Sequence, residues 1–203
     1  AIALIIAFLI YYKVGSNLDF FGLSIDIGWG IIPFAVIVFL AVVNSVNLTD
    51  GLDGLAGGVS LVYLLFFGAI VALIGAPEMD MVALASFAVC GGLIAFLAVN
   101  TFPAKIFMGD TGSLALGGFI ACLALFSGKA LLIPIMGIMF VLSALSDIIQ
   151  VAYYKKTKKR VFLMAPLHHH FEKKGVHENR IVTIYIIVTS LLSAVCLCLE
   201  IAL

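Results

Sequence analysis

The chain has 203 residues, of which 64% are hydrophobic and only 11% are charged, and its formal net charge is zero. Water-soluble domains have roughly half apolar and about a quarter charged residues, so a core surrounded by water cannot accommodate this composition. The chain is therefore predicted to be an integral membrane protein, and its neutral charge argues against a nucleic-acid partner.

Long apolar stretches recur along the chain at the length of a membrane-spanning helix, which is about 20 residues. We predict an all-α, polytopic membrane protein with about seven spans, which form a single transmembrane domain over residues 1–203. The first stretch, AIALIIAFLI, is typical of the interior of a span, so we expect further spans before residue 1. In chain order the expected spans are 1–12, 27–47, 56–76, 81–100, 112–128, 130–152 and 181–203.

The connections alternate between the two sides of the membrane. Those at 44–55, 100–111 and 153–180 fall on one side and carry nine of the eleven basic residues, whereas only Lys13 and Lys129 fall on the other side. Cytoplasmic loops carry an excess of Lys and Arg, so this distribution predicts that the three connections face the cytoplasm. On the opposite side, SNLDFFGLSIDIG and GAPEMD are expected to be ordinary short connections.

The first unusual stretch is NSVNLTDGLDGLAGG, at residues 44–58. Each third residue has turned by about 300°, so polar residues at that spacing cannot all share one face of a straight helix. We expect the helix to end near Thr49 and the glycines to turn the backbone, so that the polar groups surround a ligand or an ion. The alternative is a plain helix end with turn-forming Asp-Gly pairs. The four polar residues at this spacing are Asn44, Asn47, Asp50 and Asp53.

The second stretch is NTFPAKIFMGDTGSL, at residues 100–114, which leads into the next span. Asp110 lies where that helix is expected to begin, and Thr111 or Ser113 is expected to cap it. Free backbone amides at a helix start also attract anions. An exposed Phe102 or Phe107 can stack on a nucleotide base, although interfacial packing is the common role of such residues.

The third stretch is APLHHHFEKKG, at residues 165–175. Three contiguous histidines are poorly spaced for one zinc ion, and beside Lys173 and Lys174 they suit phosphate better. The basic run KKTKKR at 155–160 indicates membrane topology, or alternatively attraction to anionic lipids. Aspartates that share a site with phosphate need a divalent cation between them, and Mg²⁺ is the usual one. The three stretches together predict phosphoryl transfer at the cytoplasmic membrane surface.

The chain resembles the polyprenyl-phosphate N-acetylhexosamine-1-phosphate transferases over essentially its whole length, and these three stretches are the main evidence for the resemblance. The first two, NSVNLTDGLDGLAGG and NTFPAKIFMGDTGSLALGG, mark the superfamily, and RVFLMAPLHHHFEKKG marks its muramoyl-pentapeptide branch. The resemblance implies a ten-span, dimeric enzyme of the bacterial cytoplasmic membrane, with its active site facing the cytoplasm. It implies Mg²⁺-dependent transfer of phospho-MurNAc-pentapeptide from UDP-MurNAc-pentapeptide to undecaprenyl phosphate, which gives lipid I and UMP in peptidoglycan biosynthesis.

The resemblance also implies roles for individual residues. Asp110 corresponds to the Mg²⁺ ligand, and His168, His169 and His170 correspond to a His loop near the sugar and the phosphates. Phe107 corresponds to the residue that stacks on uracil, with Asn100 nearby. The expected catalytic residues are Asp110, Asp50, Asp53, His169 and His170. The expected nucleotide-substrate site consists of Asn47, Asp50, Gly51, Leu52, Asp53, Asn100, Phe107 and His168.

Two features depart from the family pattern. An Asp-Asp pair precedes the family's equivalent of the first span here, and this chain does not contain it. Asp147 lies within a span, where the family often has an apolar residue, and it is expected either to pair with a Lys or to line a cavity. Three alternatives stay open: a related transferase that uses UDP-GlcNAc, a membrane transporter, and a catalytically inactive remnant.

Overall fold

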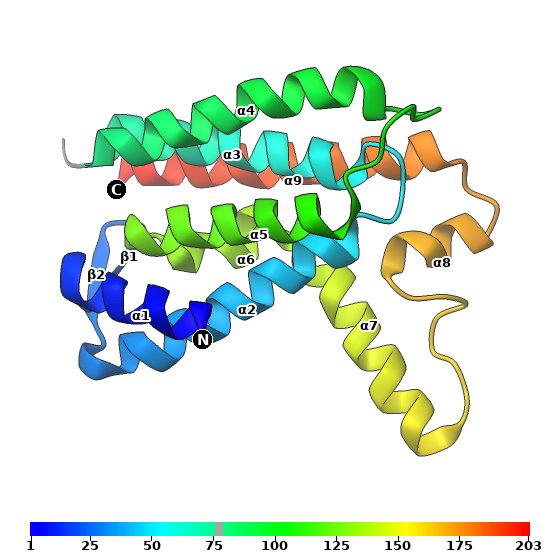
Figure 1. The fold of residues 1–203 in the computed structure, drawn as a ribbon, viewed down its shortest axis with the longest axis horizontal. Coiled ribbons are helices and arrows are strands. Elements are labelled where there is room, and N and C mark those ends of the chain that lie inside the picture. Colours follow the sequence, from blue (N-terminus) through cyan, green and yellow to red (C-terminus); the bar gives the residue numbers. More distant parts are fainter. Residues whose placement is uncertain (76–78) are drawn as a thin grey trace.

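A computed structural model describes residues 1–75 and 79–203 (Figure 1). In these residues, six helices are long and apolar enough to cross a membrane, as expected for a multi-pass membrane protein. The predicted GAPEMD connection contains residues 76–78 and the predicted 56–76 span ends at residue 76, and these three residues lie outside the described ones. The six spans comprise a short 3₁₀ turn, Gly28–Gly30, leading into α2 (Ile31–Thr49), then α3 (Leu55–Ile74), α4 (Asp80–Asn100), α5 (Gly109–Phe126), α7 (Ile138–Thr157) and α9 (Glu178–Ala202).

Four smaller elements complete the helical part of the described residues. Helix α1 (Ile2–Lys13) is apolar but has only 12 residues, in agreement with the prediction of a shortened first span. A 3₁₀ turn (Ala130–Leu132) and the four-residue α6 (Ile133–Met136) precede α7, and α8 (Leu167–Lys173) precedes α9. The all-α, polytopic prediction is therefore confirmed, with the two local corrections that follow.

The predicted span 130–152 is wrong as a single helix. Pro134 lies in the first turn of α6, and Gly137 ends α6 and begins α7 with φ near −95° and ψ near 27°. Proline suits only the first turn of a helix, and this pair therefore separates the apolar run into two helices. Helix α7 then continues to Thr157, beyond the predicted end at residue 152, because a helix satisfies its own backbone hydrogen bonds after the apolar sequence ends.

The connection at 13–26 is not an ordinary loop, since it contains an antiparallel hairpin of β1 (Asn17–Phe20) and β2 (Leu23–Asp26). Phe21 and Gly22 form its turn with φ values of 46° and 75°. Two positive φ values match the right-handed twist of the two flanking strands. The hairpin is fastened to the end of α9, where the Phe21 backbone N–H donates to Glu200 and Lys129 pairs with Glu200 at 2.7 Å.

Helix α3 lies at the centre of the bundle. It packs against both α4 and α9, while α2 packs against α5. Tyr63 and Phe67 of α3 are fully buried and stack with their ring centroids 5.7 Å apart. Helix α7 tilts away from the bundle, at the end opposite to the hairpin (Figure 1).

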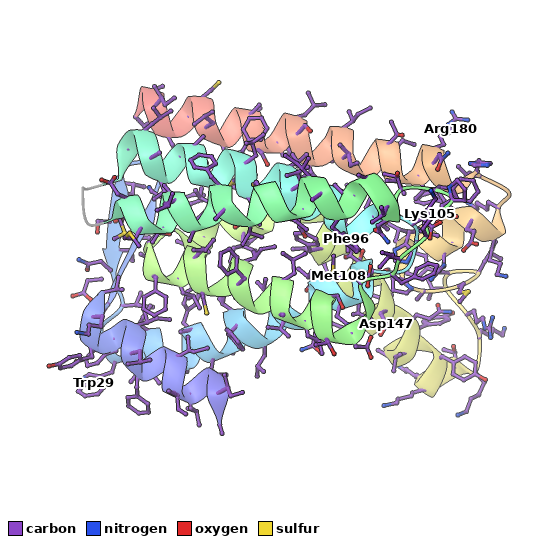
Figure 2. All side chains as sticks on the ribbon, turned by 45° about the horizontal axis from the view of Figure 1, so that its top comes forward. Trp29, Phe96, Lys105, Met108, Asp147 and Arg180 are labelled. Carbon is purple, nitrogen blue, oxygen red and sulfur yellow. The ribbon has the colours of Figure 1, made fainter. Side chains whose placement is uncertain are left out.

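Three connections, at 50–54, 101–108 and 158–177, gather at the end of the bundle that is far from the hairpin (Figure 1). Figure 2 shows Lys105, Met108, Asp147 and Arg180 toward this end and Trp29 at the other. The connections that carry most of the basic residues thus lie at one end of the bundle, as predicted from the alternation of successive connections between the two sides of the membrane.

We expect this end to face the cytoplasm. A cysteine introduced at Lys158 should be protected from a membrane-impermeant maleimide in intact cells and should react after the cells are lysed. The matched control is Ser24→Cys, in the exposed strand β2, which should react without lysis. Both are made in a background without the four native cysteines. Reaction at position 158 from outside intact cells would reverse the predicted orientation.

Candidate active site

A polar cavity of about 330 Å³ opens where the connections after α2 and α4 meet the start of α9. It brings together residues that are more than 120 positions apart in the sequence. Seven of the predicted site residues line it: Asp50, Gly51, Leu52, Asp53, Asn100, Phe107 and Asp110. Four further residues line it that the sequence did not single out: Met108, Gly109, Glu172 and Glu178.

The first motif places its carboxylates at the end of α2. The helix ends at Thr49, as predicted, and Asp50 follows it directly. Gly54 has φ near 75°, a conformation that favours glycine, so the chain reverses there and enters α3. The side-chain Oδ2 of Asp53 accepts a hydrogen bond from the Ala104 backbone N–H at 2.8 Å, which ties the first motif to the second.

Asn100 provides another link between these motifs. It lies at the last position of α4 and is buried. Its Oδ1 accepts a hydrogen bond from the Gly54 backbone N–H at 3.1 Å, while its Nδ2 donates to the Ile106 carbonyl at 2.7 Å. A buried amide whose oxygen and nitrogen are both hydrogen-bonded in this way fixes the two loops relative to each other.

Asp110 lies in the first turn of α5, where the positive end of the helix dipole stabilises a carboxylate. Its Oδ1 accepts a hydrogen bond from Nδ2 of Asn47 at 3.2 Å, and the same Nδ2 donates to Oγ of Ser113 at 2.9 Å. The predicted capping role of Thr111 or Ser113 is wrong, because Met108 is the N-cap residue and no side-chain hydrogen bond caps this helix. The Ser113 hydroxyl instead donates to the Gly109 carbonyl.

Asp50 and Asp110 both line the cavity, and their charges affect each other. Burial raises the pKa of Asp50 above its ordinary value, and the nearby Asp110 carboxylate raises it further. No Lys or Arg lies among the described residues that line the cavity. A ligand that neutralises these carboxylates would therefore be favoured, and a divalent cation is the natural candidate.

The carboxylates fit Mg²⁺ better than a metal that needs a complete protein cage. Within residues 1–75 and 79–203, no group of three or more His, Cys, Asp or Glu residues converges closely enough to hold a metal ion. Mg²⁺ commonly binds through only one or two carboxylates and completes its shell with water and substrate phosphate oxygens. Asp110 and Asp50 could supply such carboxylates.

Helix α8 brings the three histidines to the first motif, but they do not face the same way. A Cβ atom built on Gly51 would lie only 2.2 Å from Nε2 of His168 and 2.9 Å from Nε2 of His169. Gly51 is thus required for the close approach of the His loop. Both glycines lie in turns, as the sequence predicted, but only Gly54 of the two has a positive φ.

His168 is fully buried against Gly51 and Tyr185. Burial lowers the pKa of His168 to about 3, with the neighbouring His169 adding to the effect. Neither ring nitrogen of His168 has a hydrogen-bond partner among the described residues. His168 is not among the described residues that line the cavity, so its contact with a substrate stays a prediction.

His169 and His170 have different partners. Nδ1 of His169 lies 2.8 Å from Oε2 of Glu172, which lines the cavity, and this contact orients the ring so that its Nε2 faces Gly51. Nδ1 of His170 accepts a hydrogen bond from the Leu163 backbone N–H at 3.1 Å, and its ring packs edge-on against Phe162. His170 therefore holds the preceding loop and does not line the cavity, while its catalytic role stays a prediction.

Phe107 and Leu52 form apolar parts of the cavity. The Phe107 side chain is 72% exposed, which leaves its ring face free for a planar ligand, whereas Leu52 is buried. Phe102 is different, since its ring packs edge-on against His177 with centroids 5.4 Å apart. Of the two phenylalanines considered for base stacking, Phe107 is the one at the cavity.

Asp147 lies at a second cavity of about 520 Å³, on the tilted helix α7. Lys155 and Arg160 also line this cavity, and no ion pair within 4.0 Å joins either of them to Asp147 among the described residues. Of the two predicted roles for Asp147, the structure therefore supports the one in which it lines a cavity.

The family model for glycosyl transferase family 4 matches residues 1–128, which include both aspartate motifs. The chain belongs to glycosyl transferase family 4. This family match covers α1 to α5 and so includes Asp50, Asp53 and Asp110.

Curated relatives extend the similarity through the His loop to the C-terminal helix. A phospho-N-acetylmuramoyl-pentapeptide-transferase of Caldanaerobacter subterraneus subsp. tengcongensis is 44% identical over 190 residues, which are 93% of this chain and 59% of the relative. Proteins of the same name from Clostridium perfringens (strain 13 / Type A) and Clostridioides difficile (strain 630) are 46% and 43% identical, over 88% and 95% of this chain. The chain spans 56% and 61% of those two relatives.

Proposed function

We propose that the protein transfers phospho-MurNAc-pentapeptide from UDP-MurNAc-pentapeptide to undecaprenyl phosphate, giving lipid I and UMP. The observation that carries the proposal is the cavity in which Asp50 and Asp110 lie beside the exposed ring of Phe107. Carboxylates for a metal and an aromatic face for a base are what a nucleoside diphosphate requires. The names of the curated relatives support this choice of substrate.

The reaction needs one substrate from water and one from the membrane. The cavity lies at an end of the helical bundle, where a nucleotide sugar can enter from water while a polyprenyl chain stays in the bilayer. Holding both substrates in one place turns an encounter between two molecules into a reaction within one complex, which can supply much of the rate.

We infer an in-line displacement at the β-phosphorus of the UDP-sugar. A phosphate oxygen of the lipid forms a bond to this phosphorus, the bond to the oxygen bridging the two phosphates breaks, and UMP leaves with the electron pair. Asp110 and Asp50 would hold Mg²⁺, which neutralises the diphosphate when bound. Phe107 would orient the uracil, and His169 would contact the sugar and the phosphates, while the buried His168 packs beside it against Gly51. A two-step route through an aspartyl phosphate is the alternative.

The proposal includes a location and an assembly. The cavity would face the cytoplasm at the bacterial cytoplasmic membrane, and the protein would act as a homodimer. The protein would act through a single transmembrane catalytic domain over residues 1–203, and a hydrophobic core that is continuous from α1 to α9 supports this. A transporter is a weaker interpretation, because the cavity with the carboxylates lies at one end of the spans and transporters usually bind substrate near the bilayer midplane.

A comparison of two nucleotide sugars tests the substrate. The protein as its gene encodes it should release UMP from UDP-MurNAc-pentapeptide at least about a hundredfold faster than from UDP-GlcNAc, each with polyprenyl phosphate and Mg²⁺. A preference for UDP-GlcNAc would replace the proposed substrate with that of a related transferase.

We expect Phe107→Ala to weaken nucleotide-substrate binding. Stacking of an aromatic ring on a base is worth about 1–3 kcal/mol, so the apparent KM for the UDP-sugar should rise roughly 5-fold to 150-fold while the melting temperature changes little. The matched control is Phe102→Ala in the same loop, where the ring packs on His177. An unchanged KM in folded Phe107→Ala would assign this ring to interfacial packing.

A further inference from the structure

Glu178 connects the C-terminal helix to the first aspartate motif. It is the first residue of α9, and its Oε1 accepts a hydrogen bond from the Asp53 backbone N–H at 2.5 Å, across 125 positions of sequence. Glu178 also lines the cavity beside Asp53. The contact is charge-assisted, and such hydrogen bonds are roughly twice as strong as those between neutral groups.

The loop that Glu178 holds is the one that carries the cavity carboxylates. Two successive backbone N–H groups of this loop are bound by side chains from different helices: that of Asp53 by Glu178 of α9, and that of Gly54 by Asn100 of α4. The Asp53 side chain in turn binds the Ala104 N–H. The position of the loop is therefore set by contacts that converge from three segments.

The Glu178 carboxylate lies in a cavity that is already acidic. Five carboxylates line this cavity, and each further negative charge opposes binding of a diphosphate. Neither ion pair among the described residues includes Glu178. Its hydrogen bond to Asp53 and its place at the positive end of α9 stabilise the carboxylate without a cation. The five carboxylates that line the cavity are those of Asp50, Asp53, Asp110, Glu172 and Glu178.

We propose that Glu178 is a positioning residue, which holds the Asp53 backbone and thereby sets the placement of Asp50 and Asp53 in the cavity. This inference rests on the proposed function, because positioning matters for turnover only if the cavity is the active site. Glu178 acts through the loop and does not touch the reacting atoms. Through Glu178, helix α9 would help to position the carboxylates of the first motif.

Three variants separate positioning from a purely structural role. Glu178→Gln keeps an oxygen acceptor at the same place and should retain turnover within about threefold, whereas Glu178→Ala removes the acceptor and should lower kcat at least about tenfold with KM nearly unchanged. The double variant Glu178→Ala/Asn179→Glu moves the carboxylate along the first turn of α9. It should recover the melting temperature through the helix dipole without recovering kcat. Asn179→Ala is the matched control, in an exposed neighbour.

The contact also has a test that does not depend on turnover. Hydrogen exchange of the backbone amides at 51–55 should accelerate at least about tenfold in Glu178→Ala and stay near the wild-type rate in Glu178→Gln. Faster exchange in Glu178→Ala, together with a wild-type protein that releases no UMP, would support the contact and refute the proposed function.

Three results would overturn the positioning role. The first is unchanged exchange at 51–55 in Glu178→Ala. The second is full turnover in that variant, and the third is equal inactivation by Gln and Ala, which would show that the charge itself is required.

Discussion

Asp110→Asn is expected to lower turnover by about a thousandfold while leaving the protein folded and inserted in the membrane. Asparagine has the same shape, and its Oδ1 can still accept the hydrogen bond that Nδ2 of Asn47 gives to Asp110 at 3.2 Å. The substitution removes only the negative charge. If Asp110 holds Mg²⁺ against the diphosphate, that charge is the part of the side chain that the reaction needs.

The measurement is UMP release across a titration of Mg²⁺, with the melting temperature as a check on folding. Asp110→Asn should need more Mg²⁺ and should reach a lower maximum rate. Asp80→Asn is the matched control, because Asp80 also begins a helix, α4, but lies outside the cavity. A wild-type rate and wild-type Mg²⁺ dependence in Asp110→Asn would contradict the metal assignment.

Gly51→Ala is expected to lower turnover by about a hundredfold, although it adds only one methyl group. The new Cβ would lie 2.2 Å from Nε2 of His168, and His168 is fully buried, so moving its ring would disturb the residues packed around it. The His loop and the first motif must then separate, and displacement of catalytic groups by about 1 Å can cost a hundredfold in rate. Steady-state UMP release measures the effect.

Gly91→Ala is the control for Gly51→Ala. It makes the same substitution in helix α4, where a Cβ on Gly91 would meet no atom within 4 Å. Full activity in Gly91→Ala together with full activity in Gly51→Ala would show that the His loop does not rest on the first motif during turnover.

The helices were largely predictable, because the bilayer requires long apolar stretches whose backbone satisfies its own hydrogen bonds. The break at Gly137 was missed although Pro134 and Gly137 stand in the sequence, since the apolar run continues through both. The hairpin at 17–26 was missed for another reason. Its strands have four residues each, too few for alternation to distinguish them from a loop.

The alternation of the connections predicted that the three motifs share one end of the molecule, but not which atoms meet. The histidines show this most clearly. They lie on the short helix α8, in which successive residues point about 100° apart, so three in a row cannot all face one site. The sequence was expected to form a loop here. Because it forms a helix, His170 contacts Leu163 while His168 and His169 lie against Gly51.

The sequence did not predict the places of two cavity carboxylates, Glu172 and Glu178. Glu172 lies within APLHHHFEKKG, three residues after His169, and that spacing places both on the same helix face. Glu178 gave no comparable signal. Its partner Asp53 is 125 positions away, and no periodicity in the sequence relates the two.

Formation of the lipid product tests the central claim most directly. The protein as its gene encodes it is incubated in membranes with UDP-MurNAc-pentapeptide, undecaprenyl phosphate and Mg²⁺, and the UMP and the lipid-linked sugar are both quantified. We expect one lipid I for each UMP, no product when a chelator removes the Mg²⁺, and recovery when Mg²⁺ is restored. A folded protein that forms no lipid I under these conditions, or that releases UMP without it, would contradict the proposed transferase.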